Sequence, residues 1–293
     1  MTESEPRRLT MSDILEGGAT LVARNLLVFV RITAPLIVPV NLVFIALLLA
    51  LRYDSTPKRT GYVFIAVYLS LVLLALIVAA GACLRAAADI QVGTSTSARA
   101  SLSFVRDRLI SFLWLVGLLL AGIGPGAALL VVWRAGRLGS LGYLALVLIP
   151  LALWLAGIWS VALPSLFLED GGVAEALKRS RALARGSYWH SLGTVIFASV
   201  LALFASVLGE LIASLFASGS ETVRLVAIVC GAIFGEVVAL PLMAAYLILL
   251  YYDLRVRKEG SASIERDSAP IAGPSAPVTA PKTEPGKRRS PRR

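Results

Sequence analysis

Three ionisable residues lie inside long apolar stretches of this chain, where charge is costly. Glu236 is about halfway along one stretch, Glu210 is in the outer third of another, and Arg31 is about one helical turn into a third. A charged side chain within a membrane is unfavourable unless it is paired, hydrated or neutralised. Arg31 can extend toward the nearer membrane surface, and Glu210 can reach water or Arg224. The three residues are candidates for an intramembrane polar site.

Glu236 has no comparable route to water. It is therefore expected to be a neutral carboxyl that donates a hydrogen bond inside the protein. The alternative interpretation is a site that couples to a proton or a ligand. Gly231 and Gly235 form a GxxxG motif just before it, which favours close approach of another helix. Prolines predict breaks or kinks that can open a cavity: Pro35, Pro39, Pro125, Pro150, Pro164 and Pro241.

Other catalytic or metal-binding chemistry has few candidates. His190 is the only histidine, and its neighbours Tyr188 and Trp189 favour an interfacial role without chemistry. Cys83 and Cys230 lie in apolar stretches without a CxxC motif, so both are expected to be small buried side chains. No nucleotide-binding, serine-hydrolase or zincin motif occurs. The sequence predicts no enzymatic activity, no metal site and no cofactor.

The residues above belong to six long apolar stretches. Each has the ~20 residues that a helix needs to cross ~30 Å of hydrocarbon, and a helix satisfies its own backbone groups within lipid. Hydrophobic residues make up 57% of the 293 residues and charged residues only 16%, too few to cover a soluble globule. We expect an all-α integral membrane protein with six transmembrane helices: Leu26–Leu51, Tyr62–Leu84, Leu109–Trp133, Leu141–Phe167, Ser191–Ala217 and Val223–Leu250.

Positive charge is distributed unequally between the two sides of these spans. One side holds only six of the 28 Lys and Arg residues: Arg52, Lys58, Arg59, Arg134, Arg137 and Arg224. Because basic loops stay in the cytoplasm, both termini are predicted to be cytoplasmic in a cell-membrane protein. The net charge of +10 then suits anionic lipid of the inner leaflet. A nucleic-acid partner is not expected, because no mixed aromatic and basic surface occurs outside the spans.

The basic connections are expected to form short helices at the headgroup level. Ser12 is a candidate N-cap, and Ile14 and Leu21 belong to the apolar face that follows it. After the break at Gly171, a basic helix is expected to end at Gly186. Its cations are predicted to contact anionic lipid headgroups: Lys178, Arg179, Arg181 and Arg185.

The segment 97–108 aligns with these two, which suggests three copies of one unit. Each unit would contain a basic interfacial helix, an outward span, a turn and a return span. The aligned positions are Arg24, Arg108 and Arg185 before the outward spans, and Asp89, Asp170 and Asp253 near the ends of the return spans. The alternative is that the similarity reflects only features common to membrane helices.

The composition changes at Glu259. From there the chain is rich in Pro, Ser, Ala, Lys and Arg and has almost no apolar content, so it is expected to be disordered. Its cations, including Lys287, Arg288 and Arg289, are predicted to contact anionic lipid. The expected organisation is a cytoplasmic leader (1–25), a transmembrane domain (26–258) and a basic tail (259–293).

Three segments together resemble a known family. They are LTMSDILEGGATLVARNLLVFVRI, ALPSLFLEDGGVAEALKRSRALARGSYWHSLG and LILLYYDLRVRKEG. The chain from about residue 9 to 260 is similar to the membrane domain found beside some bacterial glycerophosphoryl diester phosphodiesterases. The resemblance implies a six-helix membrane domain. It does not imply hydrolase activity, which in that family belongs to a separate soluble barrel with paired histidines.

The sequence therefore favours an accessory or scaffold protein without catalysis of its own. Its expected partners are anionic membrane lipids or a membrane protein at the inner leaflet. The alternative is a small transporter or permease that binds its substrate near Glu236 and the proline-kinked helices. A cavity lined by polar groups around Glu236 would favour transport, and a packed interior would favour the scaffold.

Overall fold

The protein is an all-α multi-pass membrane protein, as the sequence predicts. The computed structural model describes residues 9–53, 58–134, 144–169, 171–215 and 220–260, and within these ranges every element is a helix. Six helical segments are long and apolar enough to cross a membrane. The helices are α1 (Met11–Arg24), α2 (Leu26–Tyr53), α3 (Lys58–Gln91), α4 (Ala98–Asp107), α5 (Leu109–Arg134), α6 (Ala145–Ile158), α7 (Ala162–Leu168), α8 (Val173–Ala184), α9 (Tyr188–Leu215) and α10 (Glu221–Glu259).

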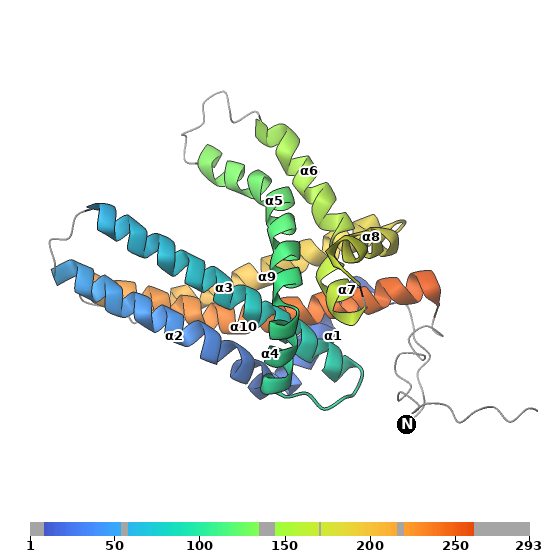
Figure 1. Cartoon of the computed structure of the whole chain (residues 1–293), viewed down its shortest axis with the longest axis horizontal. Helices are drawn as coiled ribbons and strands as arrows, with labels where there is room; N and C mark the ends of the chain where they lie inside the picture. The colour runs from blue at the N-terminus through green and yellow to red at the C-terminus, as the bar shows by residue number, and fades with distance from the viewer. Residues whose placement is uncertain (1–8, 54–57, 135–143, 170, 216–219, 261–293) are drawn as a thin grey trace, which may run out of the picture.

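The predicted unit of a short helix followed by two long helical passes occurs three times (Figure 1). The short helices α1, α4 and α8 each end just before a long apolar helix. Asn25 separates α1 from α2, and its amide donates to the Leu21 carbonyl at 2.9 Å. Arg108 separates α4 from α5, and Gly186 with a φ of 88° follows α8. The aligned positions Arg24, Arg108 and Arg185 thus fall at or beside the three joints.

The N-terminus of α1 differs from the prediction. Thr10 and not Ser12 is the N-cap: its hydroxyl accepts from the Asp13 N–H, and the Asp13 carboxylate accepts from the Thr10 N–H at 2.8 Å. Asp13 lies three residues after Thr10, which is the spacing of a reciprocal capping box, so the helix begins earlier. The predicted apolar face is correct, and Ile14 and Leu21 are buried.

Prolines do not break the helices as expected. α2 continues through Pro35 and Pro39, and α5, α6 and α10 also contain proline. The fourth span is interrupted elsewhere, between Ile158 and Ala162. There the Ser180 hydroxyl from α8 donates to the Ile158 carbonyl at 2.9 Å and accepts from the Val161 N–H at 3.2 Å. A side chain from another helix thus satisfies the backbone groups that the break releases.

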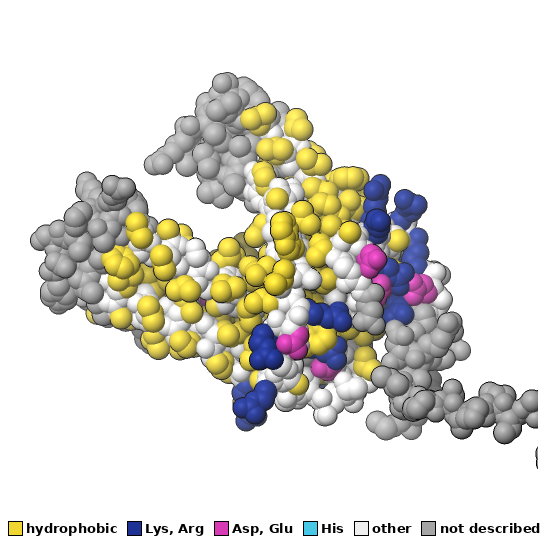
Figure 2. Space-filling view, in the orientation of Figure 1, with side chains coloured by type: hydrophobic (Ala, Val, Ile, Leu, Met, Phe, Trp, Pro, Cys, Tyr) yellow, Lys and Arg dark blue, Asp and Glu magenta, His cyan; other side chains and the backbone are white. Residues whose placement is uncertain are grey.

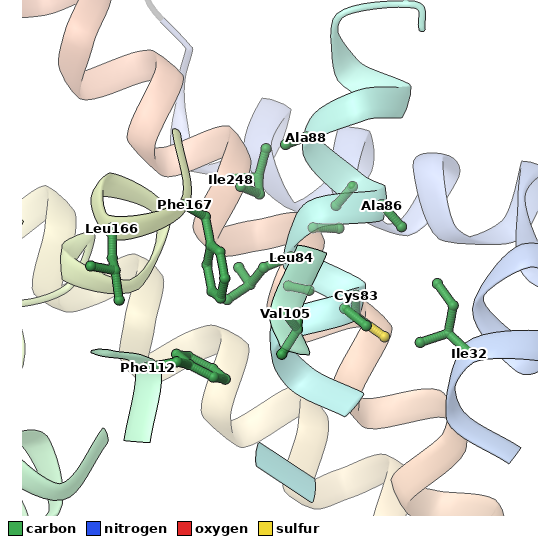
Figure 3. Close-up of a cluster of buried hydrophobic side chains, with 14 of the residues drawn as sticks. Ile32, Cys83, Leu84, Ala86, Ala88, Val105, Phe112, Leu166, Phe167 and Ile248 are labelled. Atoms are coloured by element: carbon green, nitrogen blue, oxygen red, sulfur yellow. The ribbon is translucent and has the colours of Figure 1, made fainter. Parts of the chain in front are cut away.

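The main core lies where α2, α3, α4, α5, α7 and α10 meet (Figure 3). Phe112 and Phe167 pack edge to face with ring centroids 4.9 Å apart. Phe112 also covers Gly81, where an added Cβ would lie only 2.8 Å from its ring. From this region the α5–α6 hairpin and the α2–α3 hairpin diverge, so the long helices form an open V (Figure 1).

Two of the predictions fall outside the described residues. Asp170, the aligned acid of the second unit, is one of them, and the tail from residue 261 onward, with Lys287, Arg288 and Arg289, is the other. The sixth span does not end at Leu250: α10 continues as one helix to Glu259 and closes at Gly260. Its last turns carry the side chains that define the charged end of the bundle.

Candidate functional site

Asp253 is the centre of a buried ionic group near the end of α10. Its side chain is fully buried, and its carboxylate accepts hydrogen bonds from the Leu9 N–H at 2.8 Å and from Arg257 Nε at 2.6 Å. His190 Nε2 of α9 lies 3.0 Å from the same carboxylate. Arg257 also donates to the Leu9 carbonyl at 2.7 Å. Charge-assisted bonds of this kind are strong, and here they fix the start of α1 to α9 and α10.

A second ionic group joins α7, α8 and α10. Glu169 accepts hydrogen bonds from Arg179 Nε and from the Tyr251 hydroxyl, each at 2.7 Å. Arg179 also pairs with Glu259, which in turn accepts from Arg255 Nε at 3.0 Å. Partial burial disfavours the charged form of Arg179, but its bonds to the two glutamates outweigh this and raise its pKa. We call the groups around Asp253 and Arg179 together the ionic clasp.

Exposed cations surround the clasp. Lys178, Arg181 and Arg185 are exposed on α8, whereas Arg179 is turned inward to Glu169 and Glu259. Figure 2 shows Lys and Arg gathered at this end, while hydrophobic side chains cover the long helices. The exposure of these three residues is compatible with the predicted headgroup contacts. Arg179 is already held by two carboxylates, so a headgroup would have to compete with them.

The first and second units add a smaller group at the same end. Arg85 of α3 pairs with Asp89 at 2.9 Å, and its guanidinium lies 4.5 Å from the centre of the Phe104 ring. The guanidinium of Arg108 lies 5.1 Å from the same ring and donates to the Leu166 carbonyl at 3.0 Å. Asp89 and Asp253 occupy aligned positions, yet only Asp253 is fully enclosed.

Glu236 lies inside the bundle and faces α2 and α3. It lines a narrow cleft of about 130 Å³, which has no room for a water molecule and is otherwise lined by Ile37, Val40, Asn41, Val72, Ala75 and Leu76. Its buried Oε2 has no hydrogen-bond partner among the described residues. Asn41 is 5% exposed and donates to the Ile37 carbonyl, and the Tyr68 hydroxyl donates to Asn41 Oδ1 at 3.0 Å.

The three residues proposed for one intramembrane site are not brought together. Glu210 is exposed on α9, and no ion pair joins it to Arg224 within the described ranges. Arg31 is exposed on α2, ~15 Å before Asn41 at ~1.5 Å per residue. The polar neighbours of Glu236 that sequence reasoning missed are Asn41 and Tyr68. Their signal was present, because isolated polar residues in apolar spans usually face the protein interior.

The GxxxG motif does bring another helix close. Gly209 of α9 packs directly on the backbone of Gly231, and Gly235 packs on the backbone of Ser206. A Cβ at any of the three glycines would overlap the backbone of the facing helix. This contact fixes α9 against α10 immediately before Glu236 and leaves the Glu236 side chain on the face toward α2 and α3.

The two cysteines and the histidine, the remaining candidates for chemistry, lie in different surroundings. Cys83 is buried as expected, but Cys230 is exposed, which corrects the prediction, because its position on α10 lies away from the packed glycine face. His190 is not only interfacial, since it contacts the Asp253 carboxylate. The described residues contain no group of three or more His, Cys, Asp or Glu side chains that could hold a metal ion.

Comparisons with protein-family models, with curated proteins and with solved structures found no match. Three segments far apart in the sequence, 9–32, 162–193 and 247–260, supply most of the clasp. Leu9 comes from the first, Glu169, Arg179 and His190 from the second, and Asp253 from the third.

Proposed function

We propose that this chain is an accessory or scaffold protein of the cell membrane, without catalysis of its own, that binds anionic lipid headgroups or a membrane protein at the inner leaflet. One observation carries the proposal: exposed cations collect at the end of the bundle where the ionic clasp holds the start of α1 and the basic helix α8 in place. Anionic lipid attracts each Lys or Arg near its surface by ~1 kcal/mol.

The orientation belongs to the same proposal. The charged end contains the short helices α1, α4 and α8 and the end of α10, and the positive-inside rule assigns such loops to the cytoplasm. Both termini would then be cytoplasmic. A rigid basic surface at the inner leaflet suits lipid binding, because fixed side chains lose little further freedom when a headgroup binds.

Transport through the Glu236 region is the second candidate. The unpartnered carboxyl oxygen favours it, because buried polar groups without partners often mark functional sites. The size of the cleft does not, because about 130 Å³ without room for water cannot hold a solute. Packing around Glu236 therefore supports the scaffold over the transporter.

The test is lipid retention by the purified full chain in mixed nanodiscs, measured by native mass spectrometry. The variant Lys178→Gln/Arg181→Gln/Arg185→Gln removes three exposed cations and leaves the clasp residue Arg179 in place. At ~1 kcal/mol each, their loss should weaken anionic-lipid retention by up to ~100-fold and should leave neutral-lipid retention unchanged.

Arg224→Gln is the matched control, because Arg224 is an exposed cation at the start of α10, far from the clasp. This variant should retain anionic lipid as the unmodified chain does. Added salt should weaken the lipid preference by screening. Equal retention of anionic and neutral lipid by the unmodified chain would contradict the lipid-binding proposal.

A further inference from the structure

Three polar side chains, from α2, α3 and α10, lie near one cleft in the apolar bundle. Tyr68 of α3 donates to Asn41 of α2, and Tyr68 lies within electrostatic range of Glu236 on α10. Asn41 and Glu236 line the same cleft. Three helices thus each place one polar side chain at or beside this cleft.

These three side chains have hydrogen-bond donors and acceptors that the described part of the structure leaves unused. Asn41 uses one amide N–H on the Ile37 carbonyl and keeps a second N–H, while the Tyr68 oxygen donates its proton and keeps its lone pairs. Glu236 Oε2 is buried and unpaired among the described residues. A carboxylate can only accept, whereas a carboxylic acid also donates. Only the acid form can donate to the Tyr68 or Asn41 oxygen while accepting from the Asn41 amide.

Among the described residues, no charged side chain other than Glu236 lines the cleft. The other cleft residues from α2 and α3 are uncharged, and Tyr68 is the titratable group that faces Glu236 from α3. α9 presents Ser206 beside Gly235, and its ionisable Glu210 is exposed beside Gly231. An unpaired charge in such a place costs several kcal/mol, and binding a proton removes that cost.

We propose that Glu236, Asn41 and Tyr68 form a proton-binding site inside the bundle, whose occupied form is the neutral carboxylic acid of Glu236. The bound proton is donated to an oxygen of Tyr68 or Asn41 and joins α10 to the α2–α3 hairpin. Release of the proton leaves a carboxylate in the cleft and weakens this contact. The site is independent of the lipid-binding surface at the charged end.

A proton suits this site better than a metal cation. Calcium needs six to eight oxygen ligands and magnesium keeps several waters, whereas this cleft offers one carboxyl and one amide, to which the Tyr68 phenol donates, and has no room for water. The proton needs only one acceptor oxygen beyond the carboxyl itself, which the cleft supplies.

Infrared spectroscopy of the full chain in lipid tests the proposal, because a neutral carboxylic acid has a carbonyl band separate from that of a carboxylate. The unmodified chain should show this band at neutral pH, and alkaline pH should convert it to carboxylate bands. Glu236→Gln should abolish the band completely. Glu210→Gln, the matched change at an exposed carboxyl of a neighbouring helix, should retain it.

Tyr68→Phe provides a test that does not depend on folding of the Glu236 variant. With the glutamate carboxyls labelled with ¹³C, removal of the phenol oxygen should shift the frequency of the acid band without abolishing it. Absence of the acid band from the unmodified chain at neutral pH would overturn the proposal. So would a band that none of the three variants changes, or one that sodium or potassium ions abolish at constant pH.

Discussion

Two carboxyls on α10, that of the fully buried Asp253 and that of the partly buried Glu236, have opposite surroundings. Asp253 is enclosed by the Leu9 N–H, His190 and Arg257, whereas Glu236 has an unpartnered oxygen in a cleft whose other lining residues are uncharged. They are ~25 Å apart along the helix at ~1.5 Å per residue. The same helix thus carries one carboxylate whose charge is compensated and one carboxyl whose charge is not.

The difference shows that burial alone does not decide the role of an acid. Asp253 is less exposed than Glu236, yet it accepts hydrogen bonds from Leu9 and Arg257 and contacts His190, so its bonds connect the start of α1 to α9 and α10. The cleft beside Glu236 is too small for a counter-ion, but the carboxyl can bind a proton there. Asp253 accordingly holds three parts of the bundle together, whereas Glu236 is the carboxyl that we propose binds and releases a proton.

Removal of the Asp253 carboxylate should have the largest effect. Asp253→Ala leaves Arg257 and the Leu9 N–H without their buried partner, and loss of one member of a buried pair costs ~3–5 kcal/mol. Denaturant unfolding in detergent should show this loss. Limited proteolysis should also cut near Leu9 more rapidly, because the start of α1 is released from α10.

Asp89→Ala is the control for that experiment. Asp89 is aligned with Asp253 but has a 16% exposed side chain and one ion pair, with Arg85. Its replacement should cost ~1 kcal/mol or less. An equal loss of unfolding free energy in the two variants would mean that the enclosure of Asp253 adds no stability beyond that of a partly exposed ion pair.

A permanent positive charge at Glu236 should have the next largest effect. Glu236→Lys places an ammonium group where no carboxylate is available, at a cost of ~2.5–3.5 kcal/mol for a helix centre. Glu236→Gln retains the shape and a donor, so its unfolding free energy should change by less than ~1 kcal/mol. A Gln variant that cannot fold would instead indicate a buried ion pair at Glu236.

Overpacking beside Glu236 should have a smaller effect. Gly235→Ala forces a methyl group onto the Ser206 backbone and should destabilise the α9–α10 contact by ~1–3 kcal/mol. Gly117→Ala in α5 is the matched control, since nothing lies within 4 Å of the new Cβ and alanine favours helix. Thermal unfolding in detergent should separate the two variants, and equal stability would argue against tight packing at Gly235.

The long helices and the GxxxG contact were predictable because hydrophobic length and small-residue spacing are local signals. Gly186 and the apolar face of α1 were predictable for the same reason. The break between Ile158 and Ala162 was not, because Ser180 satisfies it from another helix. The ionic clasp was not predictable either, since Leu9 and Asp253 meet only after folding.

The polar group formed by Glu236, Asn41 and Tyr68 was predicted only in part. Glu236 was identified from its depth in an apolar span, but Glu210 and Arg31, the other two candidates, do not lie beside it, because they sit at other depths and are exposed on other helices. Asn41 and Tyr68 are its neighbours instead. Sequence gives the depth of a residue in a span, and helix packing decides which side chains meet.

The orientation of the charged end is the claim on which the lipid-binding account depends most directly. Reporter fusions at Gly61, Gly139 and Ser220, together with one at Gly186, measure it in cells. The account predicts an external signal at the first three positions and a cytoplasmic signal at Gly186, which follows the basic helix α8. A cytoplasmic signal at any two of Gly61, Gly139 and Ser220 would contradict the six-span orientation and remove the basic surface from the inner leaflet.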